Sequence, residues 1–577
     1  MENPEVAMVF EEIADLLEIL GENPFRVRAY RNAARTVREL PEPVEEIVRN
    51  PNRKLEDLPG IGKDLAEKIR IIVQTGDHPM RQELREKVPP GLRELLDVPG
   101  LGPKRAWALY EKLGVKSIED LKKAAQEHRI QRLRGFGAKT ERAILEALEH
   151  LEQVQRRVYL AEAKVFAESV VRHLREVPEL HQIEVAGSYR RRKETVGDLD
   201  VLVTCDRSAP VMDRLAQYPA LADVLARGDT KMSIRLKNGM QLDLRVVPDE
   251  SYGAALQYFT GSQAHNIQIR RMAQEKGLKV NEYGVFRGDK RIAGKTEEEV
   301  YAAVGLPWIP PELREARGEI EWALQGRLPK LVELHDIRGD LHMHTTATDG
   351  RASIEEMILA CKEMGYQYMA ITDHSKRVTV AGGLDAKALR AHWAEIDRIA
   401  GRIPGITVLK GVEMDILEDG SMDLPDDVVA EADWVVASVH YGQNQPREQI
   451  TRRILNAIKN PYVHCIGHPT GRLIGKRKPY EVDLDAVLKA AADYGCFLEV
   501  NAQPSRLDLD DVALLAARER GVLIAIGTDA HSIDELRFME FGVYQARRGA
   551  LEAKHIINTR PLKELLKLLR QRRSSRA

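Results

Sequence analysis

Two carboxylates separated by one residue begin an apolar run near the middle of the chain. The segment is GSYRRRKETVGDLDVLV (187–203), in which Asp198 and Asp200 precede three apolar residues. Because alternate side chains of a strand share one face, the pattern predicts a strand on which both carboxylates point the same way. Adjacent carboxylates repel each other unless a cation lies between them, and hard oxygen ligands suit Mg²⁺ that holds a substrate phosphate. The pair therefore predicts a magnesium site that handles phosphates.

Other residues suited to phosphate chemistry accompany this strand. The Gly187-Ser188 turn can offer backbone N–H groups to phosphate oxygens, and Arg191 follows it. A third acid, Asp243, lies on the alternating apolar run QLDLRVV (241–247), which predicts a neighbouring strand. A lone D-x-D tripeptide is more often a solvated strand end, so the prediction of a catalytic site depends on the ordered set.

A further segment, YFTGS (258–262) followed by Asn266, completes a resemblance to the nucleotidyltransferase palm and nucleotide pocket of family X DNA polymerases. The resemblance implies that Asp198, Asp200 and Asp243 are catalytic and hold two Mg²⁺ ions. It also implies a set of dNTP-binding residues, which are Gly187, Ser188, Arg191, Tyr258, Phe259, Gly261 and Asn266.

From residue 334 onwards, strand-like apolar runs alternate with helical segments, and the runs end in histidine or acid. The phrase DLHMH (340–344) places His342 and His344 on one face of a strand. About seven strand–helix units in roughly 240 residues predict an α/β barrel, in which residues at the strand ends converge on one mouth. A single strand-end histidine is more often a hydrogen-bonded structural residue, and we expect this of His335, His392, His464 and His555.

The order and spacing of these strand-end residues resemble the PHP phosphoesterase domain. The resemblance implies nine metal ligands, a number that suits a cluster of about three ions. Imidazole and carboxylate ligands together suit either Mn²⁺ or Zn²⁺. Lys410, Arg472 and Asn501 near the same strand ends either steer phosphate or are solvated. The ligands that the resemblance implies are His342, His344, Asp349, His374, Glu413, His440, His468, Asp529 and His531.

Three similar phrases recur in the N-terminal part, LPGIGK (58–63), VPGLGPK (98–104) and LRGFGAK (133–139), which indicates one supersecondary unit used three times. Each copy resembles a helix-hairpin-helix, in which a glycine turn and the free N–H groups of the next helix hold a DNA phosphate without reading the base sequence. For a single copy, a glycine turn between packed helices is the alternative. The implied DNA-binding residues are Gly60, Gly62, Lys63, Gly100, Gly102, Lys104, Gly135, Gly137 and Lys139.

The first helical segment resembles the small lyase domain of the same polymerases. Lys68, within GIGKDLAEKI (60–69), stands where that family has its catalytic Schiff-base lysine. Such chemistry needs an amine that has lost its proton. A phosphate-contacting or solvated Lys68 is the alternative.

The composition is that of a multidomain chain without membrane segments. A length of 577 residues predicts about three to four domains. With 43% hydrophobic residues, the chain has no apolar run of membrane length. Its acidic start lacks the basic region of a signal peptide, so we expect a cytoplasmic protein. The four cysteines have no CxxC spacing and are expected to be reduced and structural.

The predicted fold class is multidomain, with N-terminal all-α helix-hairpin-helix domains, an α+β nucleotidyltransferase palm with a thumb, and a C-terminal α/β PHP barrel of distorted TIM type with seven strands. One amphipathic helix is expected from Val154 to Val177. The palm and the PHP domain are expected to fold and act independently. The predicted domains are 1–82 (lyase-like), 83–155 (duplex-binding), 156–248 (palm), 249–317 (thumb), 318–335 (linker) and 336–577 (PHP).

The resemblance to family X polymerases implies a DNA-directed DNA polymerase that fills short gaps in base excision repair. The resemblance adds a metal-dependent 3′-5′ exonuclease in the PHP domain, with AP endonuclease activity in some family members. Expected partners are gapped or primer-template DNA and dNTPs, with no membrane, and the protein is expected to be a monomer. Two alternatives are a nucleotidyltransferase fused to a small-molecule phosphatase and a DNA-gap-binding scaffold, although a scaffold has no use for three clustered carboxylates.

Overall fold

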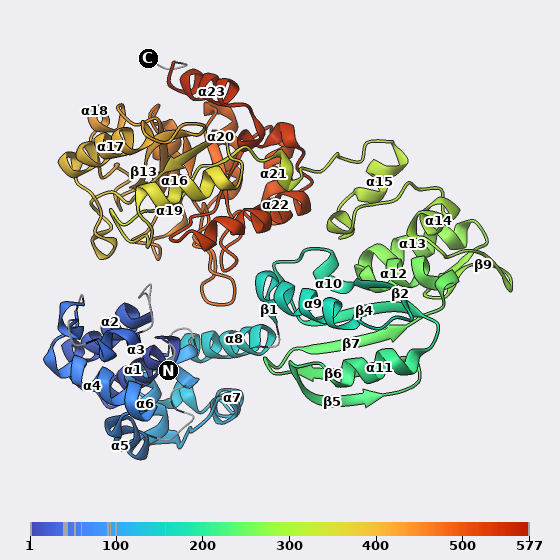
Figure 1. The fold of residues 1–577 in the computed structure, drawn as a ribbon, viewed down its shortest axis with the longest axis horizontal. Helices are drawn as coiled ribbons and strands as arrows, with labels where there is room; N and C mark the ends of the chain where they lie inside the picture. The colour runs from blue at the N-terminus through green and yellow to red at the C-terminus, as the bar shows by residue number, and fades with distance from the viewer. Residues whose placement is uncertain are drawn as a thin grey trace. The chain divides into compact units, whose positions relative to one another are not determined.

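The computed structural model describes residues 3–38, 44–50, 53–58, 60–88, 92, 94–98, 101–155 and 157–574. The chain divides into two compact units, Met1–Gln155 and Arg156–Ala577. In Figure 1 the first unit runs from blue to cyan and the second from teal to red. Each unit is described by itself below.

The first unit is helical throughout its described residues, as the sequence predicts. Apolar residues that recur every three to four positions along its helices form one buried core, which includes Phe10, Ile69 and Leu109. Ser117 caps one helix by accepting a hydrogen bond from the backbone N–H of Asp120. The helices are α1 (Asn3–Ile19), α2 (Pro24–Arg38), α3 (Val44–Arg49), α4 (Lys63–Thr75), α5 (Pro79–Lys87), α6 (Pro103–Leu113), α7 (Ile118–Gln126) and α8 (Ala138–Gln155).

The predicted continuous helix from Val154 to Val177 is wrong. Helix α8 ends at Gln155, the short strand β1 (Val158–Tyr159) follows, and α9 (Leu160–Leu174) begins after it. β1 pairs antiparallel with β3 (Thr195–Val196), so a tertiary contact replaces the helical hydrogen bonds at this point. A β-branched and an aromatic residue in β1 favour the extended conformation once a partner strand is present.

The palm, residues 157–248, is built on a five-stranded sheet in the order β2-β4-β7-β6-β5. β4 and β7 are parallel, while the other neighbouring pairs are antiparallel. The strands are β2 (Leu180–Val185), β4 (Asp198–Cys205), β5 (Leu221–Arg227), β6 (Lys231–Leu236) and β7 (Gln241–Val246), and the helices besides α9 are α10 (Gly187–Arg190) and α11 (Ser208–Ala216).

The thumb, residues 249–324, packs its helices around a smaller core with a three-stranded sheet. At its centre the buried Arg314 contacts Glu297 at 2.6 Å. Its elements are α12 (Tyr252–Thr260), α13 (Gln263–Glu275), β8 (Lys279–Asn281), β9 (Gly284–Arg287), β10 (Lys290–Ala293), α14 (Glu297–Ala303) and α15 (Glu319–Leu324).

The C-terminal part, residues 336–574, contains a sheet of seven parallel strands in sequence order, which confirms the predicted α/β barrel. The segments that follow the first and last strands meet, because the His344 N–H donates to the Ala530 carbonyl at 2.8 Å and the Asp529 N–H to the His342 carbonyl at 2.9 Å. The barrel is therefore nearly closed. The strands are β11 (Gly339–Asp340), β12 (Tyr368–Ile371), β13 (Thr407–Asp415), β14 (Trp434–Ser438), β15 (Cys465–Ile466), β16 (Phe497–Asn501) and β17 (Ile524–Gly527).

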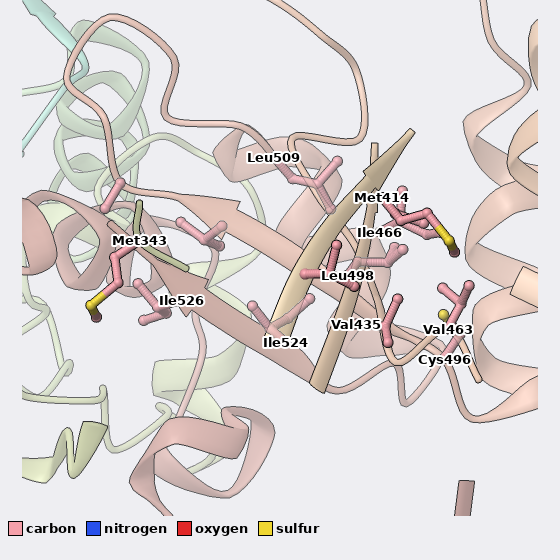
Figure 2. Close-up of a cluster of buried hydrophobic side chains, with 14 of the residues drawn as sticks. Met343, Met414, Val435, Val463, Ile466, Cys496, Leu498, Leu509, Ile524 and Ile526 are labelled. Atoms are coloured by element: carbon pink, nitrogen blue, oxygen red, sulfur yellow. The ribbon is translucent and has the colours of Figure 1, made fainter. Parts of the chain in front are cut away.

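Helices surround these strands, and apolar side chains fill the space between the two layers. Figure 2 shows part of this core, with Val435, Leu498 and Ile526 from three of the strands. The four cysteines are free thiols and three of them are buried, which confirms the predicted structural role. The helices are α16 (Ile354–Glu363), α17 (Ala386–Ala400), α18 (Asp426–Val429), α19 (Arg447–Lys459), α20 (Leu484–Tyr494), α21 (Asp511–Glu519), α22 (Met539–Arg548) and α23 (Leu562–Ser574).

The palm and the barrel lie in one compact unit and share part of a hydrophobic cluster, and the expectation that they fold and act independently stays a prediction. Leu507 and Phe541 of the barrel are part of the hydrophobic cluster of the palm. Lys164 of α9 contacts Glu540 of α22 at 2.7 Å. The hydroxyl of Tyr159 donates to the carbonyl of Ile474 in the barrel at 2.9 Å.

None of the described helices is long and apolar enough to cross a membrane.

Candidate active sites

The structure places the three predicted palm acids on two neighbouring strands of the sheet, β4 and β7. In the parallel pair of β4 and β7, Asp200 lies directly opposite Asp243 and Asp198 lies opposite Gln241. Burial, together with the charges of Asp198 and Asp243, raises the pKa of Asp200 to about 6. A bound cation stabilises the ionised form of a carboxylate that is buried beside other acids, so the residues fit divalent metal ions.

The Gly187–Arg190 turn lies against these acids. Gly187 has φ +64°, and a Cβ at this position would lie 2.9 Å from Asp200 Oδ2, so glycine is required at the approach. The two arginines on either side of Arg191 point elsewhere. Arg190 contacts Glu297 at 2.8 Å, and the guanidinium of Arg192 lies over the ring of Tyr544.

A polar cavity of about 320 Å³ adjoins this turn. Ser188 and Arg191, which are predicted to bind phosphate, are among the residues that line it. Sequence reasoning missed Arg157, whose Nε donates to Thr195 Oγ1 at 2.9 Å. Only the pairing of β1 with β3 brings this residue to the cavity. The net charge of the lining is positive, as an anion site requires. Its charged residues are Arg157, Arg191, Lys193, Arg317 and Arg548 against Glu194 and Asp511.

The remaining predicted dNTP-binding residues, from Tyr258 to Asn266, also lie together. Tyr258 and Phe259 make an edge-to-face contact with ring centroids 5.1 Å apart. Asn266 donates from Nδ2 to the Tyr258 carbonyl at 2.8 Å, which joins α13 to α12. Gly261, with φ +71°, ends α12 beside Arg191, where a Cβ would lie 3.2 Å from the guanidinium. The segment therefore approaches Arg191 of the cavity lining through Gly261.

In the barrel, the nine predicted ligands converge on one centre. Glu413 lies in the middle, with Oε2 2.9 Å from His374 Nδ1 and Oε1 3.0 Å from His468 Nε2. His440 Nε2 is 3.2 Å from the same Oε1 atom. Among the described residues, three groups could each hold a metal ion: His344, Asp349, His374 and His531; His342, His344 and Asp529; and His374, Glu413 and His440.

Orphaned nitrogen atoms indicate that this centre is built for metal ions. His342 Nε2, His344 Nδ1 and His468 Nδ1 are buried and have no hydrogen-bond partner among the described residues. A buried polar atom without a partner is costly, and a metal ion satisfies an imidazole nitrogen. The residues present therefore fit the cations that the sequence predicts.

The ionisation states of the ligands differ. Burial opposes the charged forms of His374 and His531, but nearby carboxylates outweigh it and raise both pKa values to about 9, so a metal ion must displace a proton from each. Burial, with the imidazoles of His531 and His374, lowers the pKa of His344 to about 4. Burial opposes the ionised form of Asp529, but the neighbouring histidines outweigh it and hold the pKa of this carboxyl well below its usual range. Neutral imidazole and ionised carboxylate are the forms that bind metals.

Acidic residues that sequence reasoning missed support the ligands from behind. Glu499 on β16 contacts His342 Nδ1, and its Oε2 accepts the His468 N–H at 2.6 Å. Asp415 at the end of β13 lies 3.2 Å from His440 Nδ1. A carboxylate that binds the second nitrogen of a ligating histidine fixes its ring orientation. Their only sequence signal is the position of both acids at the ends of barrel strands.

Of the three residues near the strand ends that could steer phosphate, only Asn501 is part of the metal centre. Its Nδ2 donates to Asp529 at 3.0 Å. Lys410 instead contacts Asp397 at 2.9 Å, and Arg472 contacts Glu194 of the palm at 2.7 Å.

Three of the four histidines expected to be structural make structural contacts. His392 lies 2.8 Å from Asp373, and a ring nitrogen of His464 accepts the Val435 N–H at 3.0 Å. His555 accepts the Glu552 N–H at 3.0 Å. His335 differs, because its side chain is 81% exposed.

The glycine phrases of the first unit lie at helix starts. Gly62 and Gly102 are the residues before α4 and α6, and Gly60 and Gly135 have positive φ angles of 73° and 92°. Gly137 precedes α8. Lys63 and Lys139 are exposed. Gly100 and the side chain of Lys104 lie outside the described residues.

Lys68 lies on α4, and its ammonium group pairs with the carboxylate of Asp64. Its side chain is 13% exposed. This placement does not test whether Lys68 forms a Schiff base, so that role stays a prediction.

Protein-family models match most of the chain. The matches are a helix-hairpin-helix domain at 1–78, a SAM-like helix-hairpin-helix tandem at 92–150, the DNA polymerase beta palm at 157–245, the DNA polymerase beta thumb at 255–315 and a PHP domain at 340–503.

Three relatives are similar to this chain over different lengths of it. The "DNA polymerase/3'-5' exonuclease PolX" of Bacillus subtilis (strain 168) is 41% identical over 575 residues, which cover 99% of this chain and 100% of that protein. A probable phosphatase of Thermoanaerobacter sp. (strain X514) is 36% identical over 213 residues, 35% of this chain and 82% of that protein. DNA polymerase lambda of Arabidopsis thaliana is 27% identical over 348 residues, 54% of this chain and 62% of that protein.

Proposed function

Because the chain belongs to the bacterial family X DNA polymerases that carry a C-terminal PHP domain, we propose that it fills short gaps in DNA during base excision repair. It is a DNA polymerase with an associated 3′-5′ exonuclease. The observation that carries the polymerase function is the alignment of Asp200 with Asp243, together with the turn after Gly187, whose Ser188 and Arg191 line a cavity rich in cations.

In the palm, Asp198, Asp200 and Asp243 would hold two Mg²⁺ ions. Such ions activate the primer 3′ hydroxyl and neutralise the charge that develops on the triphosphate. Ser188 and Arg191 would bind phosphate oxygens, as the cavity lining supports, and Arg157 and Lys193 add positive charge there. Tyr258, Phe259, Gly261 and Asn266 would enclose the sugar beside Arg191.

In the barrel, the nine converging ligands would hold about three Mn²⁺ or Zn²⁺ ions. Three groups, which include all the ligands except His468, support this number, and His468 contacts Glu413 of one group. Metal ions of this kind supply hydroxide for phosphodiester cleavage. Glu499 and Asp415 orient the histidine rings. AP endonuclease activity at the same centre is part of this proposal.

The substrates are DNA and dNTPs. Exposed lysines and glycine turns in the first unit support sequence-independent phosphate contacts through the helix-hairpin-helix motifs. We place the protein in the cytoplasm and expect it to act as a monomer.

The similarity of the barrel to probable phosphatases favours a second candidate function for this part, the hydrolysis of a small phosphomonoester. One set of reactions decides between them. The protein is incubated with one-nucleotide-gapped DNA in Mg²⁺, Mn²⁺ or Zn²⁺, with and without dNTPs, and in parallel with 3′-labelled single-stranded DNA or histidinol phosphate.

The proposal predicts one-nucleotide extension with dNTPs and loss of the 3′ label without them. Release of phosphate from histidinol phosphate with intact 3′-labelled DNA would support the phosphatase alternative. DNA binding without any extension or cleavage would support a scaffold.

A further inference from the structure

A helix of the barrel, α22, contacts the phosphate-binding turn of the palm. Arg548, its final residue, donates from Nη1 to the backbone carbonyl of Arg191 at 2.7 Å and to Glu315 Oε1 at 3.0 Å. Its Nη2 pairs with Asp511, the first residue of α21. One guanidinium therefore connects the palm turn, the segment between α14 and α15, and the barrel.

Arg548 is a desolvated charge with fixed partners. Its side chain is 2% exposed, and the carboxylates of Glu315 and Asp511, at 10% and 13%, offset the cost of burying it. A guanidinium presents its donors in a rigid plane, so it holds the acceptors that it binds in fixed positions. We conclude that these contacts restrain the groups around Arg548.

The most important of these groups is Arg191. Its Nε donates to Glu315 Oε1 at 3.1 Å, which is the oxygen that Arg548 also contacts. Its Nη1 donates to the Thr260 carbonyl at 2.5 Å, at the end of α12. Arg548 therefore binds both the backbone of Arg191 and the carboxylate that orients its guanidinium.

Arg191 and Arg548 both line the polar cavity beside the palm turn. Asp511 and Arg548 come from the barrel, and Ser188 and Lys193 come from the palm. We propose that Arg548 is a positioning residue of the polymerase site, which holds Arg191 and its turn in the geometry that binds a nucleoside triphosphate. Nucleotide binding by the palm then depends on a residue of the PHP part. This inference rests on the proposed polymerase function.

The positive charge of Arg548 should also favour nucleotide binding, in addition to its contacts with Arg191. Without Arg548, the carboxylates of Asp511 and Glu315 lose a cation at the edge of a cavity that must accept a triphosphate. Their negative charge then opposes nucleotide binding, while the freed Arg191 pays more entropy to order on the ligand. Both consequences weaken nucleotide binding and leave the metal-binding acids in place.

The neighbouring residue Arg547 provides a matched control. It also bridges α22 to the preceding part of the chain, through Glu312 at 2.7 Å and the Val332 carbonyl at 3.0 Å. It is not part of the cavity lining. Arg547→Ala therefore removes an arginine contact of similar kind without touching Arg191.

The test uses the full chain with Arg548→Ala, Arg548→Lys, Asp511→Asn and Arg547→Ala. Steady-state extension of one-nucleotide-gapped DNA gives kcat and KM for the dNTP, and calorimetry gives the Kd of dGTP with Mg²⁺ in the absence of DNA. Arg548→Ala is expected to raise KM and Kd roughly tenfold, with kcat within about twofold of wild type. Arg548→Lys restores part of the loss, and Arg547→Ala leaves both constants unchanged.

Asp511→Asn separates positioning from simple charge. If only the charge of the cavity mattered, removing this carboxylate would tighten dGTP binding. Because it anchors Arg548, we expect the substitution to weaken binding in the same direction as Arg548→Ala. If Arg548→Ala does not fold, Arg548→Lys and Asp511→Asn still decide the proposal. Digestion of 3′-labelled single-stranded DNA should proceed at the wild-type rate in all folded variants.

The proposal is overturned by a wild-type KM in Arg548→Ala, by an equal rise in Arg547→Ala, or by a loss confined to kcat. Tighter dGTP binding by Asp511→Asn would overturn it as well. If the wild-type protein extends no primer, the polymerase function itself is wrong, whereas active wild type with unchanged variants refutes only this inference.

Discussion

Glu499 and His342 form a buried pair behind the metal centre of the barrel, with Glu499 Oε1 against His342 Nδ1 and His342 Nε2 left without a hydrogen-bond partner among the described residues. Because the Glu499 carboxylate contacts Nδ1, the Nε2 atom of His342 is the one left for a metal ion. Both side chains are almost fully buried, at 1% and 2% exposed. The pair therefore fixes one ligand before any metal binds.

Glu499→Gln should weaken metal binding by roughly 10–100-fold, because an amide orients the His342 ring less strongly than a carboxylate. Metal retained after dialysis against graded chelator, measured by elemental analysis, checks this. Glu519→Gln, an exposed change at the end of α21, is the control. Equal retention in all three proteins would remove Glu499 from the centre.

His344→Ala or Asp529→Ala should empty or misplace part of the metal cluster and abolish the nuclease activity, while primer extension continues. Each residue belongs to a candidate ligand group, and neither lines the palm cavity. The measurements are metal content and digestion of 3′-labelled single-stranded DNA in Mn²⁺. His335→Ala changes an exposed histidine and should keep full metal content. A His344→Ala protein with all its metal and wild-type digestion would contradict the assignment.

Asp200→Ala should reduce primer extension to the background rate and leave exonuclease activity and DNA binding nearly intact. Asp200 lies between Asp198 and Asp243 in the acidic cluster, so its loss removes a ligand of the proposed Mg²⁺ ions. Single-turnover extension of gapped DNA is the measurement. Asp213→Ala on the exposed face of α11 serves as control. Normal extension by Asp200→Ala would place the active site elsewhere.

Lys63→Ala and Lys139→Ala should each weaken binding to gapped DNA of any sequence and lower the slope of log K against log salt by about one. Both lysines are exposed near the glycine turns of the first unit. Binding is measured by fluorescence anisotropy at several salt concentrations. Lys489→Ala, a 73% exposed lysine on α20, should keep the wild-type slope. A slope that stays unchanged in all variants would rule out phosphate contacts at these turns.

Glu297→Gln should destabilise the second unit by about 3–5 kcal/mol at neutral pH, since it leaves the buried Arg314 without its carboxylate partner. Burial opposes ionisation of Glu297, but Arg314 and Arg190 outweigh it and lower its pKa from 4.5 to about 2. A lowered carboxyl pKa stabilises the fold above the unfolded value, and this stabilisation is lost as pH falls from 4.5 towards 2.

The difference in free energy of unfolding between wild type and Glu297→Gln should therefore be largest near pH 7 and shrink below pH 4.5. Urea titrations at several pH values measure it. Glu298→Gln, the exposed neighbour on α14, should show little difference at any pH. A constant difference for Glu297→Gln down to pH 2.5 would contradict the assigned ion pair.

The strand alternation around Asp198 and Asp243 predicted the two strands that carry these acids, because residue types and a period of two are local properties of a sequence. The apolar runs that end in histidine or acid likewise predicted the barrel. The resemblance to the PHP domain supplied the candidate ligands, which the structure brings together around Glu413. The predicted helix from Val154 to Val177 failed because β1 gains its hydrogen bonds from β3, about 35 residues away in sequence.

What the sequence by itself determined is the identity of the reactive side chains and the elements that carry them. Only the tertiary structure decided which charges lie beside them. Arg157 enters the phosphate cavity through a strand pairing, Glu499 reaches His342 across the barrel, and Arg548 meets Arg191 across 357 residues. Such contacts depend on packing between distant segments, and the local periodicity of a sequence contains no information about which distant residue fills a given space.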